Sequence, residues 1–240
     1  MIKEVKYSEC KFSFEFKGDE GIYVPTLKES IDGVINILKE ITREQAPEAF
    51  VKLKITKFDT GSFDIDFLVI LEQTKNLLGS GEEAAKHIVS ILGNIFIVKQ
   101  FLKGQSPEQI EDEADKVKIK NHTDEEMTVD KKVADTYFNN PKIDNMVINI
   151  FNVIDKEEDK TELIIKNEMN EQVRIPKKDF EDMKKQVVHE RTNNNKVFSN
   201  TVETSLLIRK PDLTGKLKCT LSQGQFKKDY GEYKLFCVNG

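Results

Sequence analysis

Two aspartates are spaced so that they could bind a divalent cation together. Asp64 and Asp66 alternate with apolar residues in a predicted strand, so their side chains share one face. Carboxylate oxygens are ligands of Ca²⁺ and Mg²⁺. The hairpin predicted for this segment also sets Lys54 opposite Asp66, and oppositely charged pairs across two strands commonly stabilise sheets. We therefore interpret the two aspartates as structural and predict no metal site, with cation binding as the alternative.

The histidines and cysteines do not have the spacing of metal ligands or catalytic groups. They are His87, His122, His189, Cys10, Cys219 and Cys237. Metal sites are usually marked by pairs of such residues a few positions apart. We predict no catalytic residue and no cofactor. Catalytic groups can be distant in the chain, however, so an enzyme is kept as the third hypothesis.

The C-terminal part is basic within an acidic protein. Residues 209–240 contain seven Lys or Arg against three Asp or Glu, whereas the formal net charge of the chain is −5. A solvated basic face explains this segment, and the overall charge opposes a protein that coats nucleic acid. The alternative function is a nucleic-acid or nucleotide-binding module, with lysines on phosphates and a tyrosine stacked on a base. Its contacts would be Lys216, Lys218, Lys227, Lys228 and Tyr230.

The N-terminal part has the alternation and capping signals of a β-α-β-β unit. Phenylalanines alternate with polar residues over 12–17, which predicts a half-buried strand. A capping box that begins at Thr26 predicts a helix over 26–41 with one apolar stripe. Strands over 51–58 and 62–70 follow, joined by a turn that contains glycine. We expect a small antiparallel sheet with one face covered by the helix.

The most apolar segment of the chain, over 77–102, predicts a helix with apolar residues on all sides. Its dense apolar run is shorter than the about 20 residues that span a bilayer, and it contains Asn94. We expect a central core helix. As alternatives, its surplus apolar surface could contact a membrane surface or a second copy of the chain, the latter through Ile95, Phe96 and Phe101.

One stretch of the sequence occurs twice. Residues 117–132 (VKIKNHTDEEMTVDKK) and 163–178 (LIIKNEMNEQVRIPKK) align without gaps and share six identical positions. Each copy predicts a strand, a polar turn, a second strand and then a helix, over 133–155 and 179–188. Duplicated units usually build a scaffold by packing on each other. We expect the two hairpins to form one four-stranded sheet around a pseudo-twofold axis, backed by the two helices.

Together these segments predict an α+β protein in two parts. The body covers 1–190, with the β-α-β-β unit and the apolar helix over 1–104 and the duplicated hairpin–helix repeat over 116–188. A short acidic helix over 108–115 is expected to link them. A small β domain is expected over 201–240. Since a closed small barrel needs more than the about three strands that fit there, we expect an incomplete barrel or one that another chain completes.

Four short motifs carry a resemblance to a protein group. They are Thr60-Gly61-Ser62-Phe63-Asp64-Ile65, Phe101-Leu102-Lys103-Gly104 at the end of the apolar helix, the paired Ile-Lys-Asn hairpins, and Arg209-Lys210-Pro211. In these motifs and in its order of elements the chain resembles uncharacterised two-domain proteins of bacterial genomes, prophages and mobile elements, which have an α+β body and a small β-barrel domain. The resemblance implies no activity. It implies that the protein is a phage or mobile-element accessory that acts in host–phage defence or counter-defence.

The composition suits a water-soluble globular protein. Charged residues make up 33% and hydrophobic residues 38%. The N-terminal residues have no continuous apolar run, so we expect no secretory signal, and the odd cysteine number indicates a reduced, cytoplasmic protein. The leading hypothesis is a non-enzymatic binding or assembly protein that acts through protein–protein contacts. Its partner would be another protein or a second copy in a homo-oligomer, without a membrane span.

Overall fold

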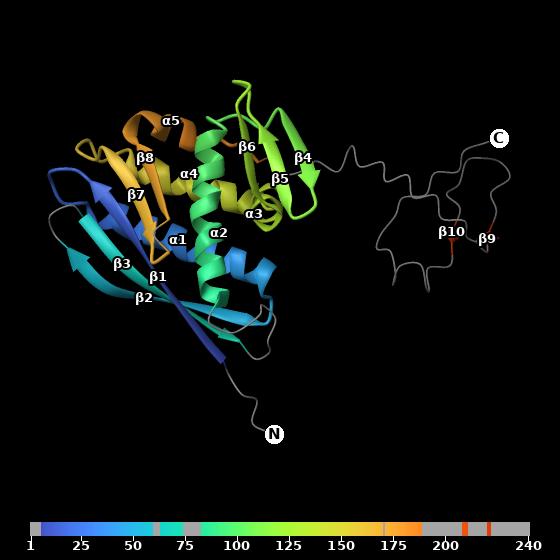
Figure 1. The fold of residues 1–240 in the computed structure, drawn as a ribbon, viewed down its shortest axis with the longest axis horizontal. Coiled ribbons are helices and arrows are strands. Elements are labelled where there is room, and N and C mark those ends of the chain that lie inside the picture. Colours follow the sequence, from blue (N-terminus) through green and yellow to red (C-terminus); the bar gives the residue numbers. More distant parts are fainter. Residues whose placement is uncertain are drawn as a thin grey trace. The chain divides into compact units, whose positions relative to one another are not determined.

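The computed structural model describes residues 6–59, 63–73, 83–169, 171–188, 208–210 and 220–221. The chain divides into two compact units, Met1–Arg191 and Thr192–Gly240. The described part of the first unit contains eight strands and five α-helices in two antiparallel sheets, which confirms the α+β class (Figure 1). None of the helices in this described part is long and apolar enough to cross a membrane.

The larger sheet has five antiparallel strands in the order β2-β3-β1-β7-β8. Its first three strands and one helix form the expected β-α-β-β unit, in which β1 lies between β3 and β7. The alternation along β1 places Phe12, Phe14 and Phe16 in the core, as expected. The bounds are β1 Lys6–Lys17, α1 Val24–Gln45, β2 Ala49–Asp59, β3 Phe63–Gln73, β7 Glu162–Asn167 and β8 Gln172–Pro176.

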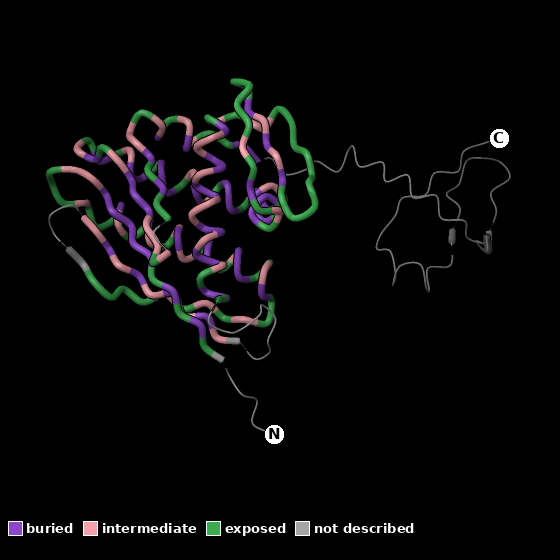
Figure 2. The backbone as a smooth tube through the Cα atoms, in the orientation of Figure 1, coloured by how far each residue is buried: buried purple, intermediate pink, exposed green. Residues whose placement is uncertain are grey.

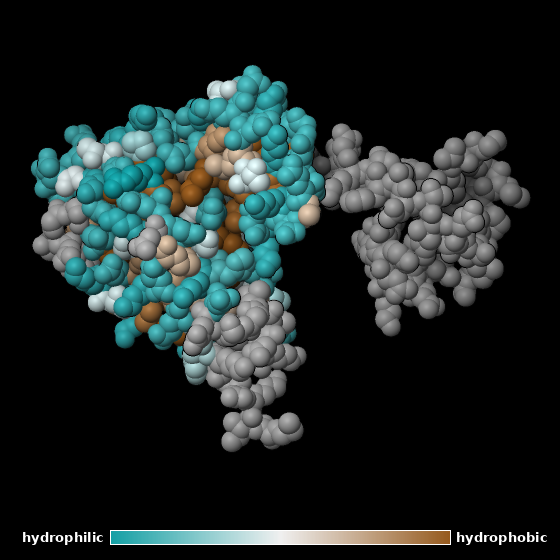
Figure 3. Space-filling model, in the orientation of Figure 1, coloured by the Kyte–Doolittle hydropathy of each residue, from teal (hydrophilic) through white to brown (hydrophobic). Residues whose placement is uncertain are grey.

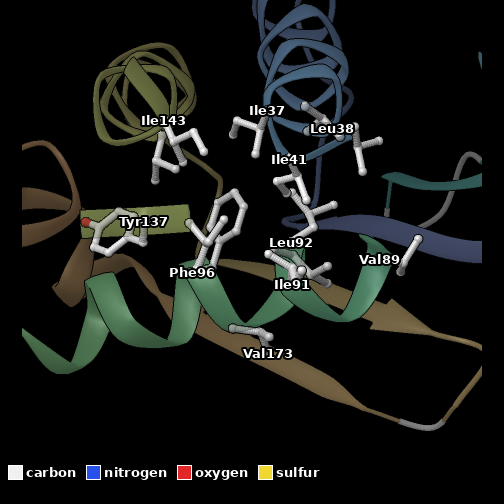
Figure 4. Packing of buried hydrophobic residues seen from close by; sticks show 14 of the residues in the cluster. Ile37, Leu38, Ile41, Val89, Ile91, Leu92, Phe96, Tyr137, Ile143 and Val173 are labelled. Carbon is white, nitrogen blue, oxygen red and sulfur yellow. The ribbon is translucent and has the colours of Figure 1, made fainter. Parts of the chain in front are cut away.

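Three helices pack together on one face of this sheet. They are α1, α2 (Glu83–Phe101) and α4 (Pro141–Ile154). The helix α2 is the expected core helix, and Ile37 and Ile41 of α1 and Ile143 of α4 point toward its buried side chains (Figure 4). The capping box expected at the start of α1 is wrong. The helix begins earlier, at Val24 after Tyr23, with Pro25 in its first turn, where a missing N–H costs nothing.

A line of aromatic rings joins the sheet to the helices. The rings of Phe14 and Phe96 lie 6.1 Å apart, those of Phe96 and Phe151 lie 6.3 Å apart, and those of Phe151 and Phe180 lie 5.2 Å apart. These residues come from β1, α2, α4 and the short helix α5 (Phe180–Met183). Segments far apart in sequence therefore share one core, and Figure 2 shows the buried backbone running through all of them.

The smaller sheet contains β4 (Gln109–Glu113), β5 (Lys116–Lys120) and β6 (Glu126–Asp130). The acidic helix expected over 108–115 is therefore wrong. Ala114 has a positive φ of 46°, which turns the chain back, and the acidic strand β4 then pairs with the lysine-rich strand β5. Glu111 lies opposite Lys118 and Glu113 opposite Lys116. Opposite charges that face each other across two strands favour this pairing.

The two similar segments form hairpins of the same register, but they do not share a sheet. Val117 lies opposite Val129 and, in the other hairpin, Leu163 lies opposite Ile175. The expected four-stranded sheet is wrong, because β5–β6 pairs with β4 whereas β7–β8 extends the larger sheet through β1. The strand β7 is apolar on both faces, since Ile164 is buried between Leu163 and Ile165, so it fits inside a sheet.

The helices that follow the hairpins also differ from expectation. The segment 133–155 forms two helices, α3 (Lys131–Phe138) and α4, because Asn140 accepts a hydrogen bond from the Lys142 N–H and Pro141 starts a new helix. Asp130 caps α3 in the same way through the Lys132 N–H. Pro176 stands at the equivalent position of the second hairpin, and only a 3-10 turn (Lys177–Asp179) and α5 follow it.

In the second unit the structure describes only β9 (Ile208–Lys210) and β10 (Thr220–Leu221), which pair antiparallel. The remainder of the expected β domain, including its five candidate contact residues, lies outside the described residues. The incomplete barrel therefore remains a prediction. The turn expected at 60–61 and the start of the apolar helix before Glu83 also lie outside them.

Candidate functional site

A groove opens along α2 between the two hairpins. Its larger part has a volume of about 400 Å³ and a smaller part adds about 130 Å³, and Ile97 lines both. Figure 3 shows hydrophobic side chains gathered there between hydrophilic surfaces. We call this feature the α2 groove. The larger part is lined by Ile97, Gln100, Phe101, Lys103, Met127, Lys178, Asp179 and Asp182.

The floor of the α2 groove is apolar because one side of the core helix is left open. Ile97 and Phe101 are one helical turn apart, so they lie on the same side of α2, and both are only half-buried. Met127 of β6 is half-buried beside them. By contrast, Ile95 and Phe96 are fully buried on the other sides of the same helix. The helix thus contributes to the core and to the groove at once.

The charged groups at the rim of the groove bind one another. Lys103 Nζ donates to Glu125 Oε2 at 2.6 Å, and Gln100 Nε2 donates to Asp179 Oδ2 at 2.7 Å. Asp182 pairs with Lys185 at 2.6 Å. The hydrogen bond from Lys103, with those from Asn121 and Thr123, lowers the pKa of Glu125 to about 2. The rim is therefore polar and mostly paired, while the floor is apolar. Lys178 is exposed, and its side chain has no hydrogen bond or ion pair among the described residues.

A buried polar network lies inside the body, away from solvent. Asp144 Oδ1 accepts hydrogen bonds from Lys99 Nζ at 2.5 Å and Tyr137 Oη at 2.7 Å, and Oδ2 accepts from the N–H groups of Val187 and Val188. Lys99, Tyr137 and Asp144 are all 0% exposed. Burial lowers the pKa of Lys99 and raises the pKa of Tyr137 well above its usual value.

This network cannot meet a substrate, because its members are closed off from solvent. A buried carboxylate needs hydrogen-bond donors in place of water. The carboxylate of Asp144 accepts four hydrogen bonds. Its role is to hold the last described residues of the body against α2 and α4. The network is structural, and sequence reasoning missed it because Lys99, Asp144 and Val187 are far apart in the chain.

The two aspartates that could bind a cation do not form a metal site. The residues nearest the turn already pair in a different register, with Asp59 opposite Asp64, so Asp66 lies opposite Lys57 and not Lys54 as expected. Asp64 lies opposite Glu15, and burial is the main cause of its raised pKa. Within the described part of the chain, no group of three or more His, Cys, Asp or Glu side chains could hold a metal ion.

The other candidate residues are dispersed. His87 is half-buried on α2, and His122 is exposed in the β5–β6 turn. Cys10 is buried in the core, and burial raises the pKa of its thiol to about 12, which makes it a poor nucleophile. His189, Cys219, Cys237, Lys216, Lys218, Lys227, Lys228 and Tyr230 lie outside the described residues.

Of the three residues expected to contact a second copy, only Phe101 reaches a surface. Ile95 and Phe96 are 0% exposed and belong to the core, so they are not available to a partner. Phe101 instead lines the α2 groove together with Ile97. The sequence showed only that apolar residues surround the whole helix α2. Which side of α2 stays accessible depends on where the two hairpins pack.

The duplicated motif encodes the two turns beside the groove, and its second copy also lines the groove. Asn121 Oδ1 accepts from the N–H groups of Thr123 and Glu125, and its amide donates to Glu125 Oε2 at 2.9 Å. Asn167 does the same with Glu171, at 2.6 Å. Asparagine side chains commonly close turns in this way. The identical Asn and Glu residues are therefore explained by local structure.

Comparisons of the chain with protein-family models, with curated proteins and with solved structures find no match. A function must therefore be inferred from the surfaces of the molecule itself. The α2 groove is a recess with an apolar floor and a mostly paired polar rim.

Proposed function

We propose that this protein is a non-enzymatic binding or assembly protein that holds an apolar segment of a partner protein in the α2 groove. One observation carries the proposal: Ile97, Phe101 and Met127 are left half-buried on a helix and strand that otherwise belong to the core. Protein interfaces combine an apolar centre with a polar rim. Small polar ligands need several free polar groups that converge on them, and here most of the rim groups bind each other, which leaves Lys178 alone without a partner among the described residues.

The form of the groove favours a helix as its occupant. Its lining residues on α2 run from position 89 to position 101, which corresponds to about 18 Å of helix at 1.5 Å per residue. A parallel or antiparallel helix of about three turns has a similar length. Ile97 and Phe101 form a ridge with the i, i+4 spacing that packs against another helix. An amphipathic helix would place its apolar side chains on them.

Photo-crosslinking from the floor of the groove tests this proposal. A benzoylphenylalanine placed at Met127 should crosslink to a partner in cells that express the protein. Thr128 is the matched control, because it is the next residue of β6 but is exposed on the other side of the strand. The crosslinked segment, made as a peptide, should bind the purified protein and show helical circular dichroism in the complex.

The substitution Met127→Lys should weaken that binding by about tenfold or more, because it places a charge on the apolar floor. Thr128→Lys should leave it unchanged. Equal crosslinking from positions 127 and 128, or equal binding by the two lysine variants, would contradict the proposal. If the crosslinked protein is a second copy of this chain, light scattering should show a defined oligomer that Met127→Lys dissociates.

The alternative function uses the basic C-terminal segment. Seven basic residues against three acidic ones over 209–240 support it. Binding of single-stranded DNA should then fall steeply with salt, and charge reversal at Lys227 and Lys228 should weaken it. Binding that is indifferent to salt and to both substitutions would eliminate this function.

A further inference from the structure

The strand β2 is a long edge of the larger sheet. It covers 11 residues, Ala49–Asp59, and in the described part of the chain it pairs with β3 alone. Figure 1 shows it at the margin of the sheet, away from β7 and β8. A strand in this position presents unpaired N–H and C=O groups along its outer side, and these can pair with a further strand.

The side chains of β2 are also incompletely covered. Phe50 is 69% exposed and Ile55 is 49% exposed. Val51 and Leu53 point toward the core face, yet they are only half-buried. The helices that cover this face therefore do not fully shield its last strand. A further strand beside β2 would cover part of this apolar surface.

The outer face of β2 carries positive charge. Lys52 and Lys54 lie two residues apart on this face, and both are exposed. Lys52 forms an ion pair with Glu72 of the neighbouring strand. Lys54 lies opposite Leu68, and no ion pair of Lys54 occurs among the described residues. A cross-strand carboxylate on the open side would be the favourable neighbour of this lysine.

A second copy of the chain is a poor occupant of this edge. In an antiparallel pair related by a two-fold axis, each side chain lies opposite one on the same face of the sheet. The registers centred on residues 52, 53 and 54 therefore place Lys52 opposite Lys52, Lys52 opposite Lys54, and Lys54 opposite Lys54, whereas the register centred on residue 51 places Lys52 opposite Phe50. Like charges directly opposite each other destabilise a strand pair. A partner strand of opposite charge avoids this repulsion in every register.

We propose that β2 takes up an extended acidic segment of a partner protein as a sixth strand of the sheet. The bulge at Thr56 ends the regular ladder, so the segment pairs with Ala49 to Ile55, about 23 Å of strand. It carries Asp or Glu at alternate positions, toward Lys52 and Lys54, and apolar residues between them, toward Val51 and Leu53. The main chain supplies affinity and the alternate side chains supply selectivity. This surface is distinct from the α2 groove.

Three synthetic peptides test the proposal on the full chain. The first has glutamates alternating with valines over seven residues, the second has lysines in place of the glutamates, and the third is the acidic peptide with alternate backbone nitrogens methylated. The acidic peptide should bind at least about tenfold more tightly than the lysine peptide, and methylation should abolish binding. Backbone amide shifts in NMR spectra should be confined to residues 49–55 and their neighbours in β3.

Three substitutions test whether the acidic peptide binds at β2. Lys54→Glu should lower the affinity for the acidic peptide by about tenfold or more, whereas Lys39→Glu, at an exposed lysine of α1, should not change it. Met127→Lys in the α2 groove should also leave it unchanged, so failure here and failure of the proposed function can be told apart. No binding of the acidic peptide, equal binding of the lysine peptide, or dimerisation through β2 would overturn the proposal.

Discussion

The hairpins β5–β6 and β7–β8 have the same strand register and the same turn, yet they belong to different sheets. The difference is clearest at one position of their first strands. Ile164 of β7 is fully buried, whereas the equivalent Lys118 of β5 is partly exposed and pairs with Glu126. The local motif therefore determines a hairpin, and the residue on its second face matches a face that is covered in β7 and open to solvent in β5.

The turns of the two hairpins also contact different elements. Glu168, in the turn of β7–β8, exchanges hydrogen bonds with Lys11 of β1, through its N–H and through its carboxylate. His122 occupies the equivalent position in the other turn and is exposed. The Asn121 amide instead donates to the carbonyl of Phe101, at the end of α2. One turn thus extends a sheet, and the other supports a wall of the α2 groove.

The segments after the two hairpins meet at Asp144. Tyr137 of α3 follows the first hairpin and donates to this carboxylate, and Val187 and Val188 follow the second hairpin and do the same. Lys99 of α2 completes the network and also donates to the carbonyl of Lys185. The two hairpins are separate in their sheets but are joined through this buried group.

The largest expected effect comes from removing this junction. Asp144→Ala leaves the buried Lys99 ammonium without a counter-ion, with the Lys185 carbonyl as its acceptor, and it leaves a tyrosine hydroxyl and two N–H groups without an acceptor. We expect a loss of about 3–5 kcal/mol in the free energy of unfolding, measured by urea denaturation. Asp155→Ala is the control, because Asp155 also binds a lysine, Lys184, but near the surface. It should cost less than about 1 kcal/mol, and equal losses in the two variants would refute this account.

The next effect follows from exchanging the residues that distinguish the hairpins. Ile164→Lys places an ammonium at a position that is 0% exposed, so it should cost about 2–4 kcal/mol. Lys118→Ile in β5 removes only a surface ion pair and should change the free energy of unfolding by less than about 0.5 kcal/mol. Urea denaturation measures both free-energy changes, provided that the variants and the parent have equal m-values. Similar costs at the two sites would show that this position does not decide the sheet.

The sequence is sufficient to predict elements whose signal is local. Alternation places Phe12, Phe14 and Phe16 in the core, and the apolar pattern identifies α2 as a core helix. The hairpins, too, are predicted by their repeated pattern. Their assembly is not, because pairing with β1 or β4 depends on contacts between distant segments, and no local pattern encodes these.

Two errors show how local signals can mislead. The acidic run before Lys116 has helical composition but forms β4, since a lysine-rich partner strand lies next to it. The expected pair of Lys54 and Asp66 fails because the strands leave the turn with Asp59 opposite Asp64, so that Lys57, and not Lys54, faces Asp66. The sequence indicated the α2 groove only in part, through the surplus of apolar residues in α2. Which of them stay open depends on packing, so Phe101 was identified but Ile97 and Met127 were not.

The turns provide a smaller test of the comparison. Asn121 is buried and bonds to α2, whereas Asn167 is less buried and bonds only within its own turn. Asn121→Ala should therefore cost about 2 kcal/mol, because it also leaves the Phe101 carbonyl without its partner, and Asn167→Ala about 1 kcal/mol. Thermal unfolding of both variants against the parent measures the difference. A larger loss at Asn167 would contradict the supporting role of the first turn.

The smallest effect concerns the acid stability of the first turn. Lys103, then Asn121 and Thr123, lower the pKa of Glu125 from its ordinary 4.5 to about 2. Since folding lowers this pKa, the ionised turn contributes its full stability above pH 4.5 and loses it as the pH falls toward 2. Lys103→Met removes the largest cause and should raise the pKa of Glu125 toward 4.5, as followed by NMR of its side chain. The group is exposed, so added salt should raise the pKa of Glu125 in the parent as well. A Glu125 pKa that responds to neither change would show that Lys103 is not the cause of the shift, and the rim of the α2 groove would then contain an unpaired lysine.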